Sequence, residues 1–274
     1  MTDIWILVLA MAATGAFAGL IAGLFGIGGG IVMVPAMFYA FQFLGYDDPR
    51  IMQVAVGTSL AVIIATSLRS VSAHAKRGAV DFVVLKTWAP WIVIGTLVGA
   101  VIAHLLPGNF LTGLFGAMAI LLSAQFFFGR PDWRLADEMP GGPLRWGLGG
   151  GIGILSALMG IGGGVLGVTL MTLCGKSIHR AVATAAGFGV AIGLPGAIGF
   201  VVTGWGQDAV PWSLGYVNLP GFALLAGSAF FVAPLGAKLA HALPERTLKR
   251  CFAVGLVVVG VMLVREAWLA SAAS

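Results

Sequence analysis

The sequence predicts an all-α polytopic membrane protein, built from two inverted repeats of five apolar segments each. Three observations support this fold class. Charged residues make up 9% of the 274 residues and hydrophobic residues 59%, whereas about 25% of a soluble domain is charged. Ten apolar segments follow one another, and one glycine motif occurs twice. Abundant apolar residues exclude a disordered chain, and two cysteines are too few for a disulfide scaffold.

The apolar segments are longer and more uniformly apolar than the strands of a membrane barrel, so we expect helices. The first segment carries one early charge, Asp3, and is long enough to span a bilayer, so we expect a retained helix and not a signal peptide. The segments expected in the first half are Ile4–Leu24, Ile31–Leu44, Ile51–Leu68, Phe82–Leu106 and Phe110–Phe128. Those expected in the second half are Leu144–Met159, Val165–Leu173, Ala181–Thr203, Val217–Leu243 and Cys251–Leu269.

An internal repeat relates the two halves. The motif Gly-Ile-Gly-Gly-Gly occurs at Gly26–Gly30 and again at Gly160–Gly164. Two further matches lie in the same order along the chain, one around Arg50 and Arg180 and one around His104 and His241. Collinear matches of this kind indicate a duplicated unit. The predicted organisation is a first repeat at 1–128, a cytoplasmic linker at 129–143 and a second repeat at 144–274.

The distribution of charge predicts the orientation of the repeats. Because each repeat contains five segments, an odd number, the second should be inverted relative to the first. With that topology, thirteen of the 15 basic residues lie on one side and only Arg50 and Arg265 on the other. The positive-inside rule makes the first side cytoplasmic, so both termini are expected outside, in a multi-pass protein of the inner (plasma) membrane. Topology explains the basic excess, and no nucleic acid is expected as a partner.

The segments around each glycine motif leave one alternative open. They are either full spans or re-entrant hairpins that enter and leave on the same side, and both arrangements give the same topology elsewhere. Val165–Leu173 is far shorter than the about 20 residues of a bilayer span. Its length favours a glycine-broken or re-entrant helix in the second half.

The duplicated glycines are the first candidates for a binding site. Consecutive glycines allow positive φ and interrupt a helix, and the helices that follow would direct their N-terminal N–H groups at the two loops. Such helix ends bind anions. The alternative is that these glycines only let helices pack closely. The candidate anion-binding residues here are Gly28, Gly29, Gly30, Gly162, Gly163 and Gly164.

Polar side chains in apolar segments are further candidates, because hydrocarbon penalises them. Gln53, Thr58 and Ser59 lie in the third segment and are expected to tune an anion site. The alternative for a hydroxyl is a hydrogen bond to the carbonyl four residues earlier in its own helix. That alternative is preferred for Thr66 and Ser67 and stays open for Thr58 and Ser59.

Arg50 and Arg180 begin matching helices of the two repeats. Each either attracts an anion from its own side of the membrane or extends its charged end to the interface. No acidic residue occupies the middle of any apolar segment, which favours an anionic substrate. No metal-ligand spacing and no nucleophile–base pair is recognisable, so no catalytic residue, metal or cofactor is expected, and the protein is not expected to be an enzyme.

These residues resemble a known family. Gly26–Gly30 followed by Val34-Pro35 and by Ala55–Leu60 (Ala-Val-Gly-Thr-Ser-Leu) is similar to the first half-motif of the sulfite exporter TauE/SafE family of permeases, and the second glycine motif resembles its second half. The resemblance implies an inner-membrane permease for sulfur-containing anions such as sulfite, sulfonates or sulfoacetate. The second half departs from the pattern at Thr169 and at Gly187–Val190.

The sequence thus predicts a secondary transporter that moves small sulfur-containing anions by alternating access between two inverted halves. Its partners would be the anion and the lipid bilayer. Coupling to a proton, a homo-oligomeric state and the direction of transport stay open. So do two alternatives, an anion channel of the same architecture and a permease for a non-sulfur small anion.

Overall fold

A computed structural model describes residues 2–25, 28–128, 134–239 and 245–272. Within them each of the ten expected apolar segments contains a helix, which confirms the all-α fold class. In order, the elements are α1 (Thr2–Phe25), α2 (Gly30–Phe43), α3 (Ile51–Ala75), α4 (Phe82–Leu105), α5 (Gly108–Phe128), α6 (Gly142–Met159), α7 (Gly164–Leu173), α8 (Ile178–Thr203), β1 (Ser213–Leu214), β2 (Val217–Asn218), α9 (Leu219–Leu239) and α10 (Glu245–Ala272).

The helices differ in whether they are long enough to cross a membrane. In the described part of the chain, six are long and apolar enough: α3, α4, α5, α8, α9 and α10. Helix α2 has 14 residues and α7 has 10, so they rise by about 21 Å and about 15 Å. The hydrocarbon core is about 30 Å thick, so neither helix crosses it alone. The short α7 therefore supports the glycine-broken interpretation of this segment.

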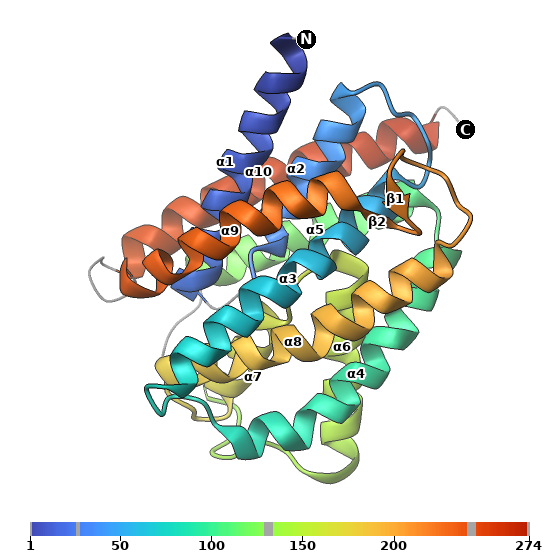
Figure 1. Ribbon diagram of the computed structural model, residues 1–274. Coiled ribbons are helices and arrows are strands. Elements are labelled where there is room, and N and C mark those ends of the chain that lie inside the picture. Colours follow the sequence, from blue (N-terminus) through green and yellow to red (C-terminus); the bar gives the residue numbers. More distant parts are fainter. Residues whose placement is uncertain (1, 26–27, 129–133, 240–244, 273–274) are drawn as a thin grey trace.

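The packing order of the helices is symmetric with respect to the two repeats. Figure 1 shows α9, α3, α8 and α4 side by side, and α1 packs on α9 while α6 packs on α4. Helix α5 packs along α10. The order is α1, α9, α3, α8, α4 and α6. By position in the repeats, α1 corresponds to α6, α4 to α9 and α3 to α8. Exchanging corresponding helices therefore reverses the order but keeps the same neighbours. The arrangement supports a two-fold relation between the repeats; their inversion across a membrane stays a prediction.

Small residues allow the outer pairs to pack closely. A methyl group placed on Gly19 of α1 would lie 2.6 Å from the carbonyl oxygen of Ala229 in α9, and one on Gly95 of α4 would overlap Gly150 of α6. On Gly116 of α5 it would lie 2.7 Å from the carbonyl oxygen of Gly260 in α10. Close helix contact through small residues is typical of membrane bundles. At these positions packing accounts for the glycine.

Helices α3 and α10 extend beyond their expected segments, to Ala75 and from Glu245, and the expected start of α9 is wrong. The expected apolar segment covers Val217–Leu243, but Val217 pairs with Leu214 in an antiparallel hairpin and α9 begins at Leu219. Asn218 sets this boundary, because its side-chain oxygen accepts a hydrogen bond from the N–H of Gly221 at 2.9 Å, as an N-cap residue does. The last residues of the expected segment, 240–243, lie outside the described residues.

Candidate functional site

The two glycine loops contact each other in the interior of the protein. A methyl group on Gly28 would lie 3.3 Å from Cα of Gly162, and one on Gly30 would overlap the carbonyl oxygen of Gly160. All four glycines are buried. Gly26 and Ile27 of the first motif lie outside the described residues. Residues 28–30 and the second loop therefore approach each other backbone to backbone.

Both loops have the left-handed backbone that glycine tolerates best. Gly28 and Gly29 have φ of 77° and 76°, and Gly160 and Gly163 have φ of 62° and 66°. Any other residue would be strained there. The helix is interrupted at these glycines, whereas Gly30 and Gly164 are already the first residues of α2 and α7. Glycine is thus required for two reasons, conformation and close contact.

The two helices that leave these loops have uncompensated N-termini. The N-cap residues are Gly29 for α2 and Gly163 for α7, and neither provides a side-chain cap. Neither first turn contains an acidic residue. The first N–H groups of a helix have no acceptor within the helix, and the helix dipole places partial positive charge there. The arrangement offers hydrogen-bond donors and positive potential to an anion, without a competing carboxylate.

Helix α3 provides hydroxyl groups beside the loops. Ser59 Oγ donates a hydrogen bond to the carbonyl oxygen of Gly160 at 2.9 Å, and a methyl group on Gly30 would lie 3.0 Å from the same Oγ. Thr66 Oγ1 lies 3.5 Å from the carbonyl oxygen of Gly28, but it also contacts carbonyls of its own helix, as expected. Of the three polar candidates in α3, only Ser59 contacts a glycine loop.

Gln53 and Thr58 have other partners. Gln53 Nε2 donates to the carbonyl oxygen of Leu106 at 3.0 Å and so caps the end of α4. Thr58 Oγ1 donates to the carbonyl oxygen of Val54 at 2.7 Å, four residues earlier, which is the alternative left open from the sequence. It also accepts a hydrogen bond from the N–H of Asn218 at 2.8 Å. The structure therefore ties both side chains to neighbouring elements.

Arg50 is paired with an acidic residue at the start of α3. Its guanidinium lies 2.8 Å from Asp48 Oδ2 and also donates to Gln207 Oε1. The hydrogen bond from Arg50 holds the pKa of the Asp48 carboxyl below its ordinary value. Arg50 lies nine residues before Ser59, about 13 Å along the helix axis. It is at the end of α3, away from the glycine loops.

Arg180 occupies the corresponding place in α8. Its Nε lies 3.9 Å from Asp81 Oδ2, and Lys176 Nζ lies 3.1 Å from the same oxygen. Helix α8 approaches the second loop at Gly189, where a methyl group would lie 3.3 Å from the carbonyl oxygen of Gly162. Nine residues separate Arg180 from Gly189, about 13 Å along the axis. Both arginines thus lie at helix ends and contact acids.

One buried hydroxyl escaped the sequence analysis. Ser156 in α6 is fully buried, and its Oγ has no hydrogen-bond partner among the described residues. A methyl group on Gly163 would lie 3.5 Å from this oxygen. Comparison of the two repeats could have identified Ser156 from the sequence. It lies four residues before the second glycine motif, and the first repeat has Ala22 at the matching position.

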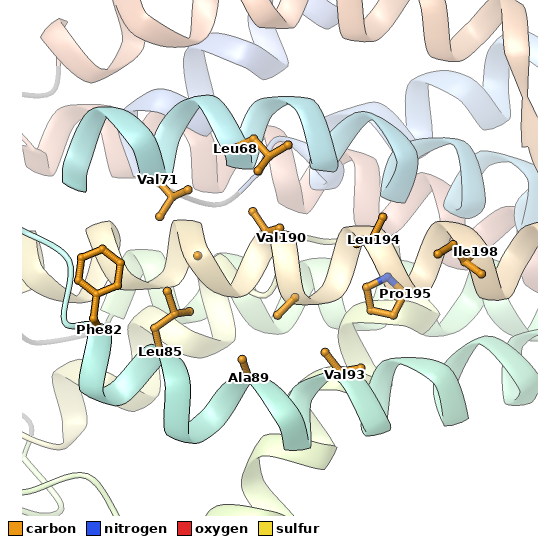
Figure 2. A pocket seen from close by; sticks show the side chains of 12 residues that line it. Leu68, Val71, Phe82, Leu85, Ala89, Val93, Val190, Leu194, Pro195 and Ile198 are labelled. Atoms are coloured by element: carbon orange, nitrogen blue, oxygen red, sulfur yellow. The ribbon is translucent and has the colours of Figure 1, made fainter. Parts of the chain in front are cut away.

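Two cavities lie away from the glycine loops. The larger, about 550 Å³, is a crevice among α3, α4 and α8. Figure 2 shows its apolar lining, with Leu68 and Val71 from α3 facing Val190 and Leu194 of α8. A smaller cavity of about 260 Å³ lies in the segment between α8 and β2, around Gln207. The apolar crevice does not suit an anion, and in this conformation the loops close on each other by direct contact.

Comparison with known proteins identifies the family. The family model described as sulfite exporter TauE/SafE matches residues 11–263. The chain belongs to the sulfite exporter TauE/SafE family. The chain is a multi-pass membrane protein, and its family and the names of its relatives indicate a membrane transporter.

Three relatives of this TauE/SafE protein are named probable membrane transporter proteins. The one from Haemophilus influenzae is 34% identical over 250 residues, which cover 90% of this chain and 94% of the relative. The one from Bacillus subtilis is 28% identical, covering 92% of this chain and 95% of the relative. The one from Methanocaldococcus jannaschii is 26% identical, covering 91% and 92%. No solved structure matches the chain.

Proposed function

We propose that this TauE/SafE protein is a secondary transporter that moves small sulfur-containing anions, such as sulfite or organosulfonates, across the inner membrane. One observation carries the proposal. Two helix N-termini without caps or acidic residues, those of α2 and α7, begin at buried glycine loops that contact each other. A buried anion needs hydrogen-bond donors to replace its water, and helix N-termini supply them.

The backbone of the two loops would form the binding site. Residues Gly28–Gly30 and Gly162–Gly164 would present N–H groups, and Ser59 would exchange its bond to Gly160 for one to the anion. Gln53 and Thr58 would act indirectly, by holding the end of α4 and the β1–β2 hairpin against α3. Arg50 and Arg180, at the far ends of α3 and α8, would attract anions toward the site from opposite sides of the membrane.

Alternating access would follow from the relation between the repeats. If the second repeat is inverted, each glycine loop opens toward a different side when one half rocks against the other. The direct contact between the loops would then represent a closed state. Both termini would lie outside the cytoplasm, as the basic residues indicate. Transport of a non-sulfur anion would use the same donors.

The experiment that tests the proposal measures uptake of radioactive sulfite into proteoliposomes. Saturable flux that is stimulated by unlabelled anion on the other side is expected of a transporter, whereas ohmic single-channel currents would indicate an anion channel. The variant Gly30→Ala should abolish the flux, because its methyl group would overlap Gly160 and separate the loops. Gly147→Ala is the matched control, since nothing lies within 4 Å of its added methyl group.

Folding of each variant is checked by size-exclusion chromatography and by its thermal unfolding in detergent. Flux through Gly30→Ala equal to that of wild type, in protein of equal stability, would exclude the glycine loops as the site. Wild-type protein that moves neither sulfite, an organosulfonate nor a carboxylate would exclude the proposed function.

A further inference from the structure

Among the described residues, three hydroxyls are buried without a hydrogen-bond partner, those of Tyr39, Ser70 and Ser156, and of these residues only Ser156 is fully buried. Thr58, Thr96 and Thr112 each donate to the carbonyl four residues earlier in their own helix, at 2.7–2.8 Å. Ser156 lies in the last turn of α6, is fully buried, and makes no such bond. A buried hydroxyl without a partner costs free energy. A ligand bound beside this hydroxyl would supply the partner that the described residues lack.

The Ser156 hydroxyl lies at the N-terminus of α7. Its oxygen would be 3.5 Å from a methyl group on Gly163, the N-cap residue of that helix. The carbonyl oxygen of Ser156 accepts a hydrogen bond from the N–H of Ile161 at 3.0 Å, so the loop is folded onto the end of α6. The unpaired hydroxyl therefore lies beside the N-terminus of α7, where the side chain of Ile192 from α8 also packs, since a methyl group on Gly163 would overlap its Cδ1.

The first repeat has no equivalent hydroxyl. Ala22 occupies the matching position, four residues before the first glycine motif. A methyl group on Gly29, the N-cap residue of α2, would instead lie 2.7 Å from the carbonyl oxygen of Ala18 and 3.2 Å from the methyl carbon of Met33. The two loops thus differ in the groups that surround them, and only the second combines a helix N-terminus with an unpaired hydroxyl among the described residues.

We propose that Ser156 is a substrate-binding residue, whose hydroxyl donates a hydrogen bond to an oxygen of the bound anion while the α7 N–H groups bind a second oxygen. The inference rests on the proposed function. It assigns the site to oxyanions that carry at least two acceptor oxygens on one centre, such as sulfite and sulfonates, over a halide ion. It also implies that the anion makes its closest contacts with the second repeat, at the loop before α7.

Ligand-induced thermal stabilisation of the full chain in detergent tests the assignment. Sodium sulfite and sodium methanesulfonate are titrated at constant ionic strength, with sodium chloride as the reference. Removing a hydrogen bond to a charged group weakens binding about tenfold or more. Ser156→Ala should therefore need about tenfold more sulfite for the same shift. Without anion its melting temperature should equal or exceed that of wild type, because an unpaired buried hydroxyl has been removed.

Ser123→Ala is the matched control. Ser123 is also buried, but its Oγ donates to the carbonyl oxygen of Ala253 at 2.7 Å, between α5 and α10. This variant should melt at a lower temperature and bind sulfite as wild type does. If Ser156→Ala binds sulfite like wild type, or loses stability without anion as Ser123→Ala does, the assignment of Ser156 is wrong while the glycine-loop site stands. If wild type responds to sulfite and methanesulfonate no more than to chloride, the oxyanion site itself is wrong.

Discussion

Asp81 connects α4 to the α7–α8 region. Its Oδ1 accepts a hydrogen bond from the N–H of Val84 at 3.1 Å, which caps α4, and its Oδ2 lies 3.1 Å from Lys176 Nζ. Its own N–H donates to Thr184 Oγ1 at 2.9 Å. Burial raises the pKa of Asp81, but the bonds from Val84 and Lys176 outweigh it, so the pKa lies below its ordinary value. The carboxylate therefore stabilises the folded state.

We expect Asp81→Asn to lower the free energy of unfolding by about 1 kcal/mol at neutral pH, because asparagine keeps the cap but loses the ion pairs. The folded-state pKa of Asp81 is depressed, so this stabilisation is complete above the unfolded pKa of about 3.9. It is lost as the pH falls through the folded pKa. Thermal unfolding in detergent at pH 7 and at steps down to pH 3 measures the difference.

Asp137→Asn provides the comparison, since Asp137 is exposed in the 134–141 segment. It should melt like wild type at neutral pH. A difference between wild type and Asp81→Asn that stays constant down to pH 3 would show that the charge of Asp81 contributes nothing.

Residue types could be predicted from the sequence, but their partners could not. Ser59 was one of three polar candidates in one apolar segment, and only the fold shows that it contacts Gly160 while Thr58 contacts Asn218. These contacts join residues about one hundred or more positions apart in the chain. Ser156 is one serine in an apolar segment, and its missing hydrogen bond becomes apparent only when every neighbouring donor and acceptor is placed.

Whole elements were more predictable than contacts. Apolar runs bounded by glycine, proline or charged residues predicted ten helices, because hydropathy and the positions of helix-breaking residues can be read from the local sequence. The break before α2 and α7 was predicted for the same reason, since consecutive glycines disfavour a helix wherever they occur. The β1–β2 hairpin was missed, because two-residue strands leave no periodic pattern. Its position depends on Asn218 and on the distant α3.

The hairpin is held to α3 by one buried hydrogen bond, and its stability should depend on that bond. Thr58→Val keeps the shape of the side chain but leaves the N–H of Asn218 without its acceptor. We expect the free energy of unfolding to fall by about 1–3 kcal/mol. Hydrogen exchange at 213–218 should become faster, measured by mass spectrometry in detergent. Thr58→Ser keeps the hydroxyl and should restore most of the protection; equal exchange in all three proteins would contradict this role.

The arrangement of the whole molecule places α3 and α8 at its centre. Each is covered by one long helix of the other repeat, α9 on α3 and α4 on α8, and then by α1 and α6 (Figure 1). Exchange of the halves reverses this order but keeps the same neighbours, as a duplicated unit would. Packing alone does not orient the halves in a membrane, since the same contacts occur whichever side is cytoplasmic. The basic residues supply that information.

Cysteine labelling in intact cells tests the predicted inversion. Asp47 precedes α3 and Ser177 occupies the matching position, 130 residues later, before α8; both are exposed. Lys76 follows α3 and Asp208 follows α8, again exposed. In an inverted repeat, matching positions lie on opposite sides. A membrane-impermeant maleimide should therefore label Asp47→Cys and Asp208→Cys in intact spheroplasts, and Lys76→Cys and Ser177→Cys only after the membrane is disrupted.

The labelling background is a protein in which Cys174 and Cys251, the two native cysteines, are replaced by serine, and it should stay unlabelled in both conditions. Each single-cysteine variant is retained only if it unfolds at the temperature of the background protein. Labelling of Asp47→Cys and Ser177→Cys from the same side would show repeats in parallel orientation. Alternating access through oppositely directed glycine loops would then lose its structural basis, because α2 and α7 would begin toward the same side of the membrane.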